Sequence, residues 1–238
     1  MSSLVIASLT PRLLDIHGDA QNAQVLATRA RWAGHEAEVV QVNGAADAAG
    51  LRPAAIVIGS GFDSDAAEVL AALDGFADSL HEWVAAGVPL LAVGLGWELL
   101  SAGTEIVQGS ALTGLGVFSG RFVPSERRSG PIVLDSKRGR VVGYEYHYRD
   151  YLLGTDEQPL GTVLSGVGNA VETAGLRVEG AVRANAFGTM QRGPILARNP
   201  KLADALLGAH APSADVESKR ADEYAVRTNR RVLGELGL

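Results

Sequence analysis

The sequence predicts an α/β protein with a mostly parallel central sheet that helices cover on both faces. Short apolar runs alternate with segments of helical periodicity over the first hundred residues. The runs at residues 54–58 and 89–93 are apolar throughout, which is typical of strands buried on both faces. Glycine turns follow both runs, at Gly59 and Gly94. Because sites in parallel sheets form at the carboxyl ends of strands, these two turns should be neighbours.

The first half of the chain predicts four strands and two helical segments. We expect the strands at residues 4–8, 38–42, 54–58 and 89–93. Residues 19–32 repeat apolar side chains with the period of a helix, and Asp19 suits the N-cap position. Residues 65–86 are rich in alanine and leucine, which favours a helix with a break at Gly75.

The second half is richer in short strands and ends in helices. We expect strands at residues 117–123, 132–134, 140–147, 160–164 and 176–182. Residues 200–208 and 215–236 predict helices, and the many charges of the second are typical of a solvated surface helix. Without a low-complexity linker or repeat, residues 1–238 are expected to form a single domain.

Composition excludes several classes of function. The chain has no cysteine, so disulfides and a thiolate nucleophile are impossible, and its five histidines lack the spacing of a metal-binding helix face. We therefore expect no metal and no cofactor. A net charge of −6 without a basic stretch argues against nucleic acid. The longest uncharged apolar stretch is shorter than the roughly 20 residues of a membrane span, and no signal peptide precedes it. We expect a cytoplasmic location and no membrane association.

Residues 88–100 read as a buried strand, a tight glycine turn and a helix. This is the shape of a nucleophile elbow, which presents a reactive side chain at its apex beside backbone N–H groups. The apex residue here is Gly94, which has no side chain. A plain tight turn between a strand and a helix would also explain Gly94 and Gly96, but not the order of the other motifs along the chain.

Five segments in a fixed order carry a resemblance to a known family. They are residues 15–22, 59–65, 114–117, 143–147 and 188–200. Together with the elbow, the chain resembles the GatD-type glutamine amidotransferase subunit of lipid II isoglutaminyl synthase, a branch of the cobyric-acid-synthase-like class I amidotransferases. The resemblance covers nearly the whole chain. It implies a flavodoxin-like class I glutamine amidotransferase fold.

The resemblance also implies two catalytic residues that this chain lacks. The family places a cysteine at the elbow and a histidine before a Gly-Pro pair, and the matching positions hold Gly94 and Arg192. A glycine cannot attack a carboxamide, and an arginine stays protonated and cannot act as the base. Leu95 replaces a small residue and would narrow the pocket. We expect glutaminase activity to be absent.

Other residues are candidates for the pocket. Gly59, Ser60 and Gly61 let the backbone turn close to the elbow and are not a phosphate loop, since no Gly-Lys-Ser/Thr follows. Glu145 and His147 share one face of a strand and could form a polar pair at the pocket rim, although a structural histidine is the commoner outcome.

Asp63 and two arginines complete the candidate set. Arg127 matches an arginine that the family carries near its pocket and could grip a carboxylate, but it could equally be a solvated loop residue. Arg192 would place a fixed positive charge in the cavity, which would favour a small anionic ligand or an internal salt bridge.

Three readings of function follow. The first is a non-catalytic docking or regulatory subunit of a Mur-ligase-like (MurT-type) enzyme that amidates peptidoglycan precursors, as the resemblance implies. The second is a stand-alone hydrolase or lyase that acts on an anionic small molecule through Glu145, His147, Asp63 and Arg192. The third is that Gly94 replaces a natural cysteine by engineering; Arg192 argues against it, because one inactivating change would leave the family histidine in place.

Overall fold

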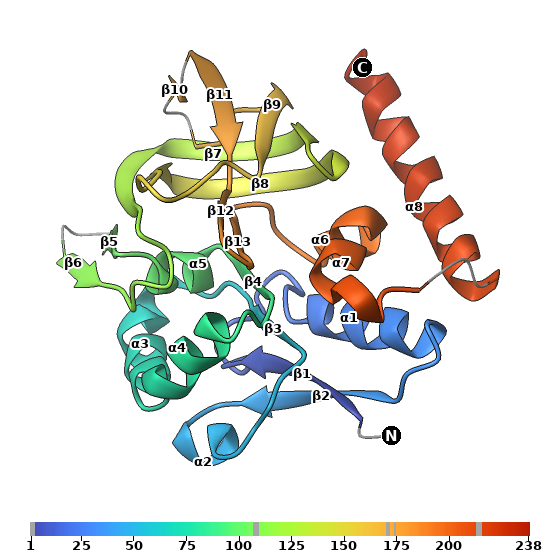
Figure 1. Ribbon diagram of the computed structural model, residues 1–238. Coiled ribbons are helices and arrows are strands. Elements are labelled where there is room, and N and C mark those ends of the chain that lie inside the picture. Colours follow the sequence, from blue (N-terminus) through green and yellow to red (C-terminus); the bar gives the residue numbers. More distant parts are fainter. Residues whose placement is uncertain (1–2, 107–109, 170–171, 174, 213–215) are drawn as a thin grey trace.

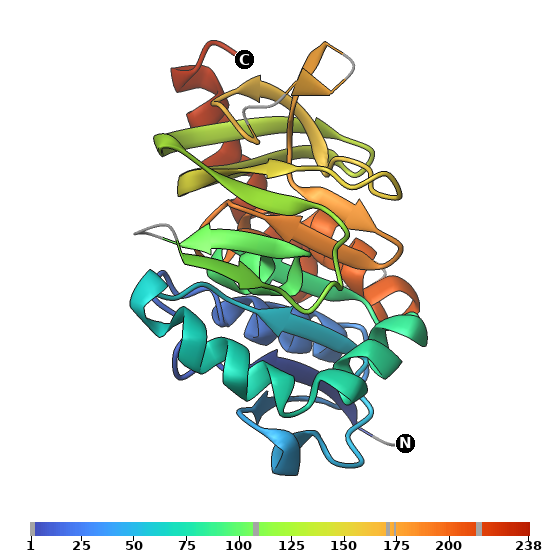
Figure 2. The same ribbon diagram turned by 90° about the vertical axis from the view of Figure 1, so that its left-hand side faces the viewer.

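Two stacked β-sheets form the frame of the molecule, with helices around the lower one (Figures 1 and 2). The computed structural model describes residues 3–106, 110–169, 172–173, 175–212 and 216–238. The strands of the first sheet are β1 (Leu4–Leu9), β2 (Ala37–Val42), β3 (Ala55–Ile58), β4 (Leu90–Val93), β12 (Ala181–Arg183) and β13 (Ala186–Thr189). The helices are α1 (Gln21–Trp32), α2 (Ala45–Ala48), α3 (Ala66–Asp74), α4 (Ala77–Ala85), α5 (Leu95–Leu100), α6 (Ile195–Arg198), α7 (Pro200–Leu207) and α8 (Val216–Glu235).

The first sheet has the strand order β12-β13-β4-β3-β1-β2. Every pairing is parallel except that of β12 with β13, which form a hairpin at one edge. Strands β3 and β4 lie inside the sheet and are buried along their whole lengths. This is the mostly parallel sheet that the apolar runs predict, and it brings the carboxyl ends of β3 and β4 side by side.

Alternating side chains of the strands feed two separate cores. Ile6, Val57 and Leu91 face α1, α6 and α7, whereas Ile56 and Leu90 face α3 and α4. Helices therefore cover both faces of the sheet, as predicted. The division between α3 and α4 falls at Gly75 and Phe76, which confirms the break expected there.

The second sheet is largely antiparallel and lies above the first (Figure 2). Its strand order is β10-β11-β9-β7-β5-β6, with β8 paired to β7. The strands are β5 (Gly103–Ile106), β6 (Ser110–Thr113), β7 (Arg121–Ser136), β8 (Gly139–Leu152), β9 (Gly161–Ser165), β10 (Glu172–Thr173) and β11 (Leu176–Glu179). The long hairpin of β7 and β8 runs across the molecule and brings the middle of β8 over the parallel sheet.

A cluster of aromatic side chains joins α5 to the second sheet. The buried Trp97 ring lies 4.4 Å from Tyr151, 4.8 Å from Phe122 and 6.1 Å from Phe118, measured between ring centroids. Tyr151 also donates its hydroxyl to Glu157 at 2.9 Å, which satisfies the polar end of a buried ring. The elbow helix is thus fixed between the two layers.

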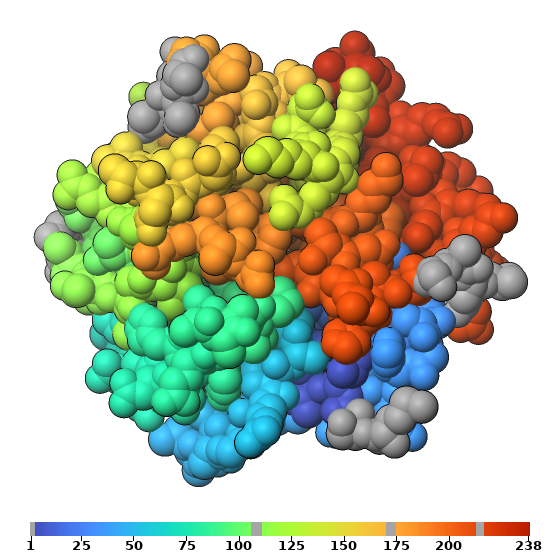
Figure 3. Space-filling model, viewed as in Figure 1, coloured from blue at the N-terminus to red at the C-terminus, as the bar shows by residue number. Residues whose placement is uncertain are grey.

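Helix α8 lies on the outside of the molecule (Figures 1 and 3). Arg29 on α1 links it to the rest of the chain. The Arg29 guanidinium donates to both oxygens of Asp204 on α7 at 2.8 and 2.9 Å, and to Asp222 on α8 at 2.6 Å. Most other charges of α8 are exposed, which agrees with the predicted solvated helix. The expected first residue of this helix, Asp215, lies outside the described residues.

Some expectations for individual elements were wrong. Asp19 does not cap α1, because Ala20 holds the N-cap position and no side chain caps the helix. Residues 117–120 precede the strand that begins at Arg121, and the expected strand at 176–182 is split at Gly180, whose φ is +71°. The expected strands at 132–134 and 140–147 are parts of the much longer β7 and β8. The sequence reading missed β5, β6, β10, β13, α2 and α6.

Candidate functional site

A cavity of about 520 Å³ lies where β3 and β4 end, under the β8 strand of the second sheet. The loop after β1, the turn after β3, the start of α5 and the middle of β8 all contribute to it. Its lining residues are Ile16, His17, Ser60, Gly61, Phe62, Asp63, Ser64, Leu95, Glu98, Tyr146, His147, Tyr148, Arg149 and Arg192. The two glycine turns predicted to be neighbours do meet here.

The turn at Gly94 has the sharp geometry of an elbow. Gly94 adopts φ +55° and ψ −123°, a conformation that other residues hold only under strain. The N–H of Gly96 donates to the carbonyl of Gly59 at 3.0 Å, and the N–H of Leu95 donates to Ser60 Oγ at 3.2 Å. A Cβ at position 96 would overlap that same Gly59 carbonyl, so only glycine allows the close approach of the two turns.

Arg192 occupies the space above the elbow. Its backbone N–H donates to the carbonyl of Tyr144 at 2.8 Å and its Nε donates to the carbonyl of Tyr146 at 2.9 Å, so strand β8 holds both the backbone and the side chain of Arg192. Its Nη1 donates to Ser60 Oγ. A Cβ built on Gly94 would overlap Arg192 Nη1 and crowd Ser60 Oγ. The guanidinium therefore sits where an elbow side chain would begin.

Two buried carboxyl groups lie near Arg192 without touching it. Asp19 accepts the backbone N–H of Gly193 at 2.7 Å and that of Ser60 at 3.3 Å, and burial raises its pKa to about 6. Burial likewise raises the pKa of Glu98, and the charges of Arg149 and Arg192 oppose that rise. Among the described residues Arg192 forms no ion pair.

A second arginine on the cavity wall is fully paired. Arg149 forms ion pairs with Glu98, 3.1 Å from Nη1, and with Asp63 through Nη2. Its Nε donates to the carbonyl of Glu105 at 2.6 Å, and Thr104 donates to Glu98 at 2.9 Å. The charge of Arg149 is therefore balanced by neighbouring carboxylates, whereas, among the described residues, that of Arg192 is not.

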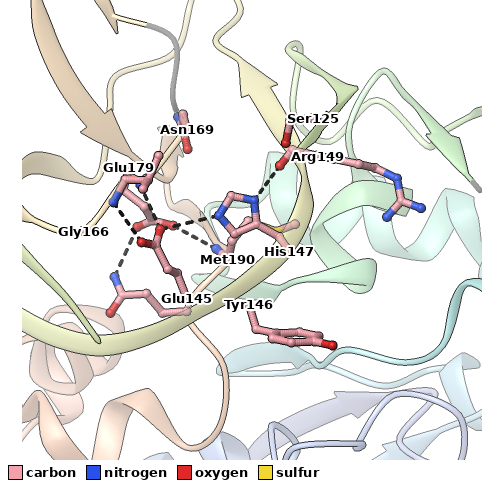
Figure 4. Close-up of polar contacts among 12 residues, drawn as sticks. Ser125, Glu145, Tyr146, His147, Arg149, Gly166, Asn169, Glu179 and Met190 are labelled. Carbon is pink, nitrogen blue, oxygen red and sulfur yellow. Dashed lines mark hydrogen bonds and ion pairs between the residues drawn. The ribbon is translucent and has the colours of Figure 1, made fainter. Parts of the chain in front are cut away.

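His147 lines the cavity and also belongs to a buried polar cluster (Figure 4). Its Nδ1 lies 2.7 Å from the carbonyl of Arg149, and its Nε2 lies 3.5 Å from Glu145 Oε2. Glu145 accepts the N–H groups of Val167 and Gly168, both at 2.8 Å. These hydrogen bonds and His147 lower its pKa although burial opposes the change. Glu179, beside them, accepts bonds from Thr189, Met190 and Gln191.

The structure brings together most of the predicted site residues. Ser60, Gly61, Asp63, Leu95, His147 and Arg192 all line the cavity beside Gly94. Glu145 pairs with His147, but it turns toward the loop after β9 and does not line the cavity. Arg127 is exposed and stacks over the Tyr146 ring, with its Cζ 5.1 Å from the ring centroid.

Sequence reasoning missed several residues in and around the cavity. Asp19 was read as a helix cap, yet its buried carboxylate connects the Ser60 turn to Gly193. Arg149 and Glu98 form the charged wall, and Tyr146 and Tyr148 supply aromatic surface. The alternation of β8 from Glu145 onward could have indicated Arg149, because residues at spacing two share a face.

The fold and the elbow define a class of protein, the class I glutamine amidotransferases. A solved structure described as a glutamine amidotransferase matches with a TM-score of 0.57 at 16% identity, covering 86% of this chain and 98% of the other. The family model of the CobB/CobQ-like glutamine amidotransferase domain matches residues 5–200. The chain belongs to this family. The flavodoxin-like amidotransferase fold predicted from the sequence is thereby confirmed.

Two curated relatives narrow the resemblance. The lipid II isoglutaminyl synthase (glutamine-hydrolyzing) subunit GatD of Staphylococcus aureus is 29% identical over 98% of this chain and 96% of its own length. The subunit of the same name from Streptococcus pneumoniae is 29% identical over 84% of this chain and 77% of its own length. Both confirm the GatD-type resemblance that the motifs indicate.

No helix within the described part of the chain is both long enough and apolar enough to span a bilayer. The described residues hold no group of three or more His, Cys, Asp or Glu side chains placed to bind a metal ion.

Proposed function

We propose that this chain is a GatD-like subunit without glutaminase activity, which docks to or regulates a Mur-ligase-like (MurT-type) enzyme in lipid II amidation. One observation carries the loss of activity: the Arg192 guanidinium fills the space in which an elbow side chain would start. Removal of a nucleophile and its base together leaves at most the weak catalysis of the remaining binding groups.

The oxyanion donors of the elbow are also occupied. An amidase of this kind stabilises a developing oxyanion with backbone N–H groups next to the nucleophile. Here the N–H of Leu95, the residue after the elbow apex, donates to Ser60 Oγ. Ser60 Oγ in turn accepts from Arg192, so one hydroxyl oxygen takes the place of a substrate oxygen. This arrangement supports a pocket that no longer hydrolyses an amide.

The subunit role is supported by the relatives and by their coverage. Both curated relatives are named as subunits of lipid II isoglutaminyl synthase, and one matches over 98% of this chain. We propose that the ligase partner then takes its amine from free ammonia or from another donor, in the cytoplasm. A stand-alone hydrolase or lyase finds less support, because Ser60, the hydroxyl nearest the elbow, has a guanidinium as its neighbour and no base.

The test measures both parts of the proposal in one preparation. The chain is co-expressed with the Mur-ligase-like protein of its own organism, and the complex is sized by light scattering while glutamate release from glutamine is followed. We expect a stoichiometric complex and glutamate release no faster than in buffer. The Staphylococcus aureus subunit with its own partner is the positive control.

Two variants sharpen the assay. Gly94→Cys alone is expected to remain inactive, because Arg192 must leave its bonds to Ser60 and Tyr146 before a side chain fits at position 94. Gly94→Cys with Arg192→His removes that obstacle and restores both catalytic residue types. Turnover of the unmodified chain would overturn the loss of activity, and absence of any complex would overturn the subunit role.

A further inference from the structure

Ser60 Oγ lies at the junction of two hydrogen-bond donors that point into the cavity. The N–H of Leu95 reaches it at 3.2 Å and Arg192 Nη1 reaches it from the other side. Ser60 is 1% exposed, so both bonds are shielded from water. A carboxylate is a better acceptor for a guanidinium than a neutral hydroxyl, because it carries the opposite charge and offers two oxygens for a bidentate contact.

The charge of Arg192 is not matched by a direct partner. None of the carboxylates in the described parts of the chain forms an ion pair with it, and its Nη2 has no hydrogen bond to a described residue. The neighbouring Arg149 is different, because Glu98 and Asp63 both bind it. The cavity therefore offers one guanidinium with unused hydrogen-bonding capacity, held in place by strand β8.

We propose that this cavity binds the carboxylate of a small organic acid, one oxygen of which displaces Ser60 Oγ from Arg192 and from the Leu95 N–H. A carboxylate is planar and presents two oxygens, which suits a guanidinium with one donor occupied by Ser60 and one open. Binding would let Arg192 exchange a neutral acceptor for a charged one without moving its backbone.

The rest of the lining limits the ligand to a small monoanionic head on a compact body. Asp63 and Glu98 are already paired with Arg149, which leaves the single positive charge of Arg192 to balance a ligand. One positive charge suits a monoanionic carboxylate better than a phosphate dianion. The outer wall carries Phe62 and Tyr148, which suit an aliphatic or amphipathic body. At about 520 Å³, the cavity falls within the usual range of about 300–1,000 Å³ for small-ligand sites.

This inference depends on Arg192 and Ser60 and not on the ligase partner. A failure to bind a carboxylate would leave the docking proposal intact, and a failure to form the complex would leave the ligand site intact. The two experiments share no readout.

The test uses butyrate and butyramide, which match in size but differ in carrying one carboxylate or one amide, with inorganic phosphate as a second anion. Calorimetric titration of the full chain should show butyrate binding at least tenfold tighter than butyramide or phosphate. Arg192→Gln should reduce butyrate affinity at least tenfold. Ser60→Ala should raise it several-fold, because the ligand no longer competes with the hydroxyl.

The controls separate a local effect from general damage. Arg183→Gln removes a surface ion pair with Asp156 and should leave butyrate affinity unchanged. If Arg192→Gln fails to fold, the opposite change expected of Ser60→Ala still tests the site. Equal binding of butyrate and butyramide, stronger binding of phosphate, or a butyrate affinity unaffected by Ser60→Ala would each overturn the proposal.

Discussion

At the scale of single residues, Asp19 makes stability depend on pH. Its pKa rises from 3.8 to about 6 in the folded chain because its carboxylate is buried. The folded state then binds more protons than the unfolded state between these values, so stability falls as pH rises from about 4 to about 6. The shift corresponds to about 3 kcal/mol, an order-of-magnitude figure.

The matched comparison is Asp19→Asn against the parent chain. The free energy of unfolding, measured with urea from pH 4 to pH 7.5, should decline with pH more steeply in the parent chain than in the variant. Contributions of other titrating groups cancel in that difference. Asp74→Asn, at an exposed position on α3, is the control and should follow the parent. Parallel curves for Asp19→Asn and the parent would show that Asp19 is not the titrating group.

At the scale of elements, one buried arginine holds the carboxyl-terminal helix. Arg29 is 4% exposed and joins α1 to α7 and α8 through Asp204 and Asp222. Arg29→Met keeps the aliphatic packing and removes the hydrogen bonds, and should cost about 1–3 kcal/mol. Arg29→Met should increase the rate of amide hydrogen exchange much more in α8 than in α1. The exposed pair of Arg231 and Glu235 provides the control, since Arg231→Met should cost no more than about 0.5 kcal/mol. Unchanged exchange in α8 would show that other contacts hold the helix.

At the scale of the whole molecule, Trp97 couples the two sheets. The ring is fully buried against Phe118, Phe122 and Tyr151, so Trp97→Ala should cost about 3–5 kcal/mol. Because the cluster spans both layers, we expect the parent chain to unfold in one transition by far-ultraviolet circular dichroism and by tryptophan fluorescence alike. Trp32→Ala, at a half-buried position on α1, should cost less. Two separate transitions in the parent would show that the layers unfold independently.

The sequence predicts the parallel sheet better than the second layer. Strands such as β3 and β4 are apolar from end to end, and this signal needs no knowledge of partners. Strands β7 and β8 are long and carry Pro124, Gly130 and Gly143, which break the apolar pattern into short pieces. Each strand is long because it pairs with the other, and the sequence of one strand alone does not reveal that pairing.

The sequence also predicts only part of the candidate site. The order of the motifs identifies Gly94 and Arg192, because each departs from the residue that the family places at that position. Their contact could not be predicted, since it depends on the carbonyls of Tyr144 and Tyr146 holding Arg192 over the elbow. Asp19 was misread because a carboxylate before a helix usually serves as a cap, whereas here the turn at Gly193 provides the stronger partner at 2.7 Å.

The overlap between position 94 and Arg192 also constrains how this chain could change over evolutionary time. A cysteine acquired at the elbow would meet a guanidinium in its place, and a histidine acquired at position 192 would find no thiol to activate. Neither single substitution offers selection a gain in amide hydrolysis. Under the proposed function, the two positions depend on each other. A change to the family residue at one position brings no gain in activity until the other position changes as well. Selection can therefore refine the pocket for ligand or partner without reopening the old reaction.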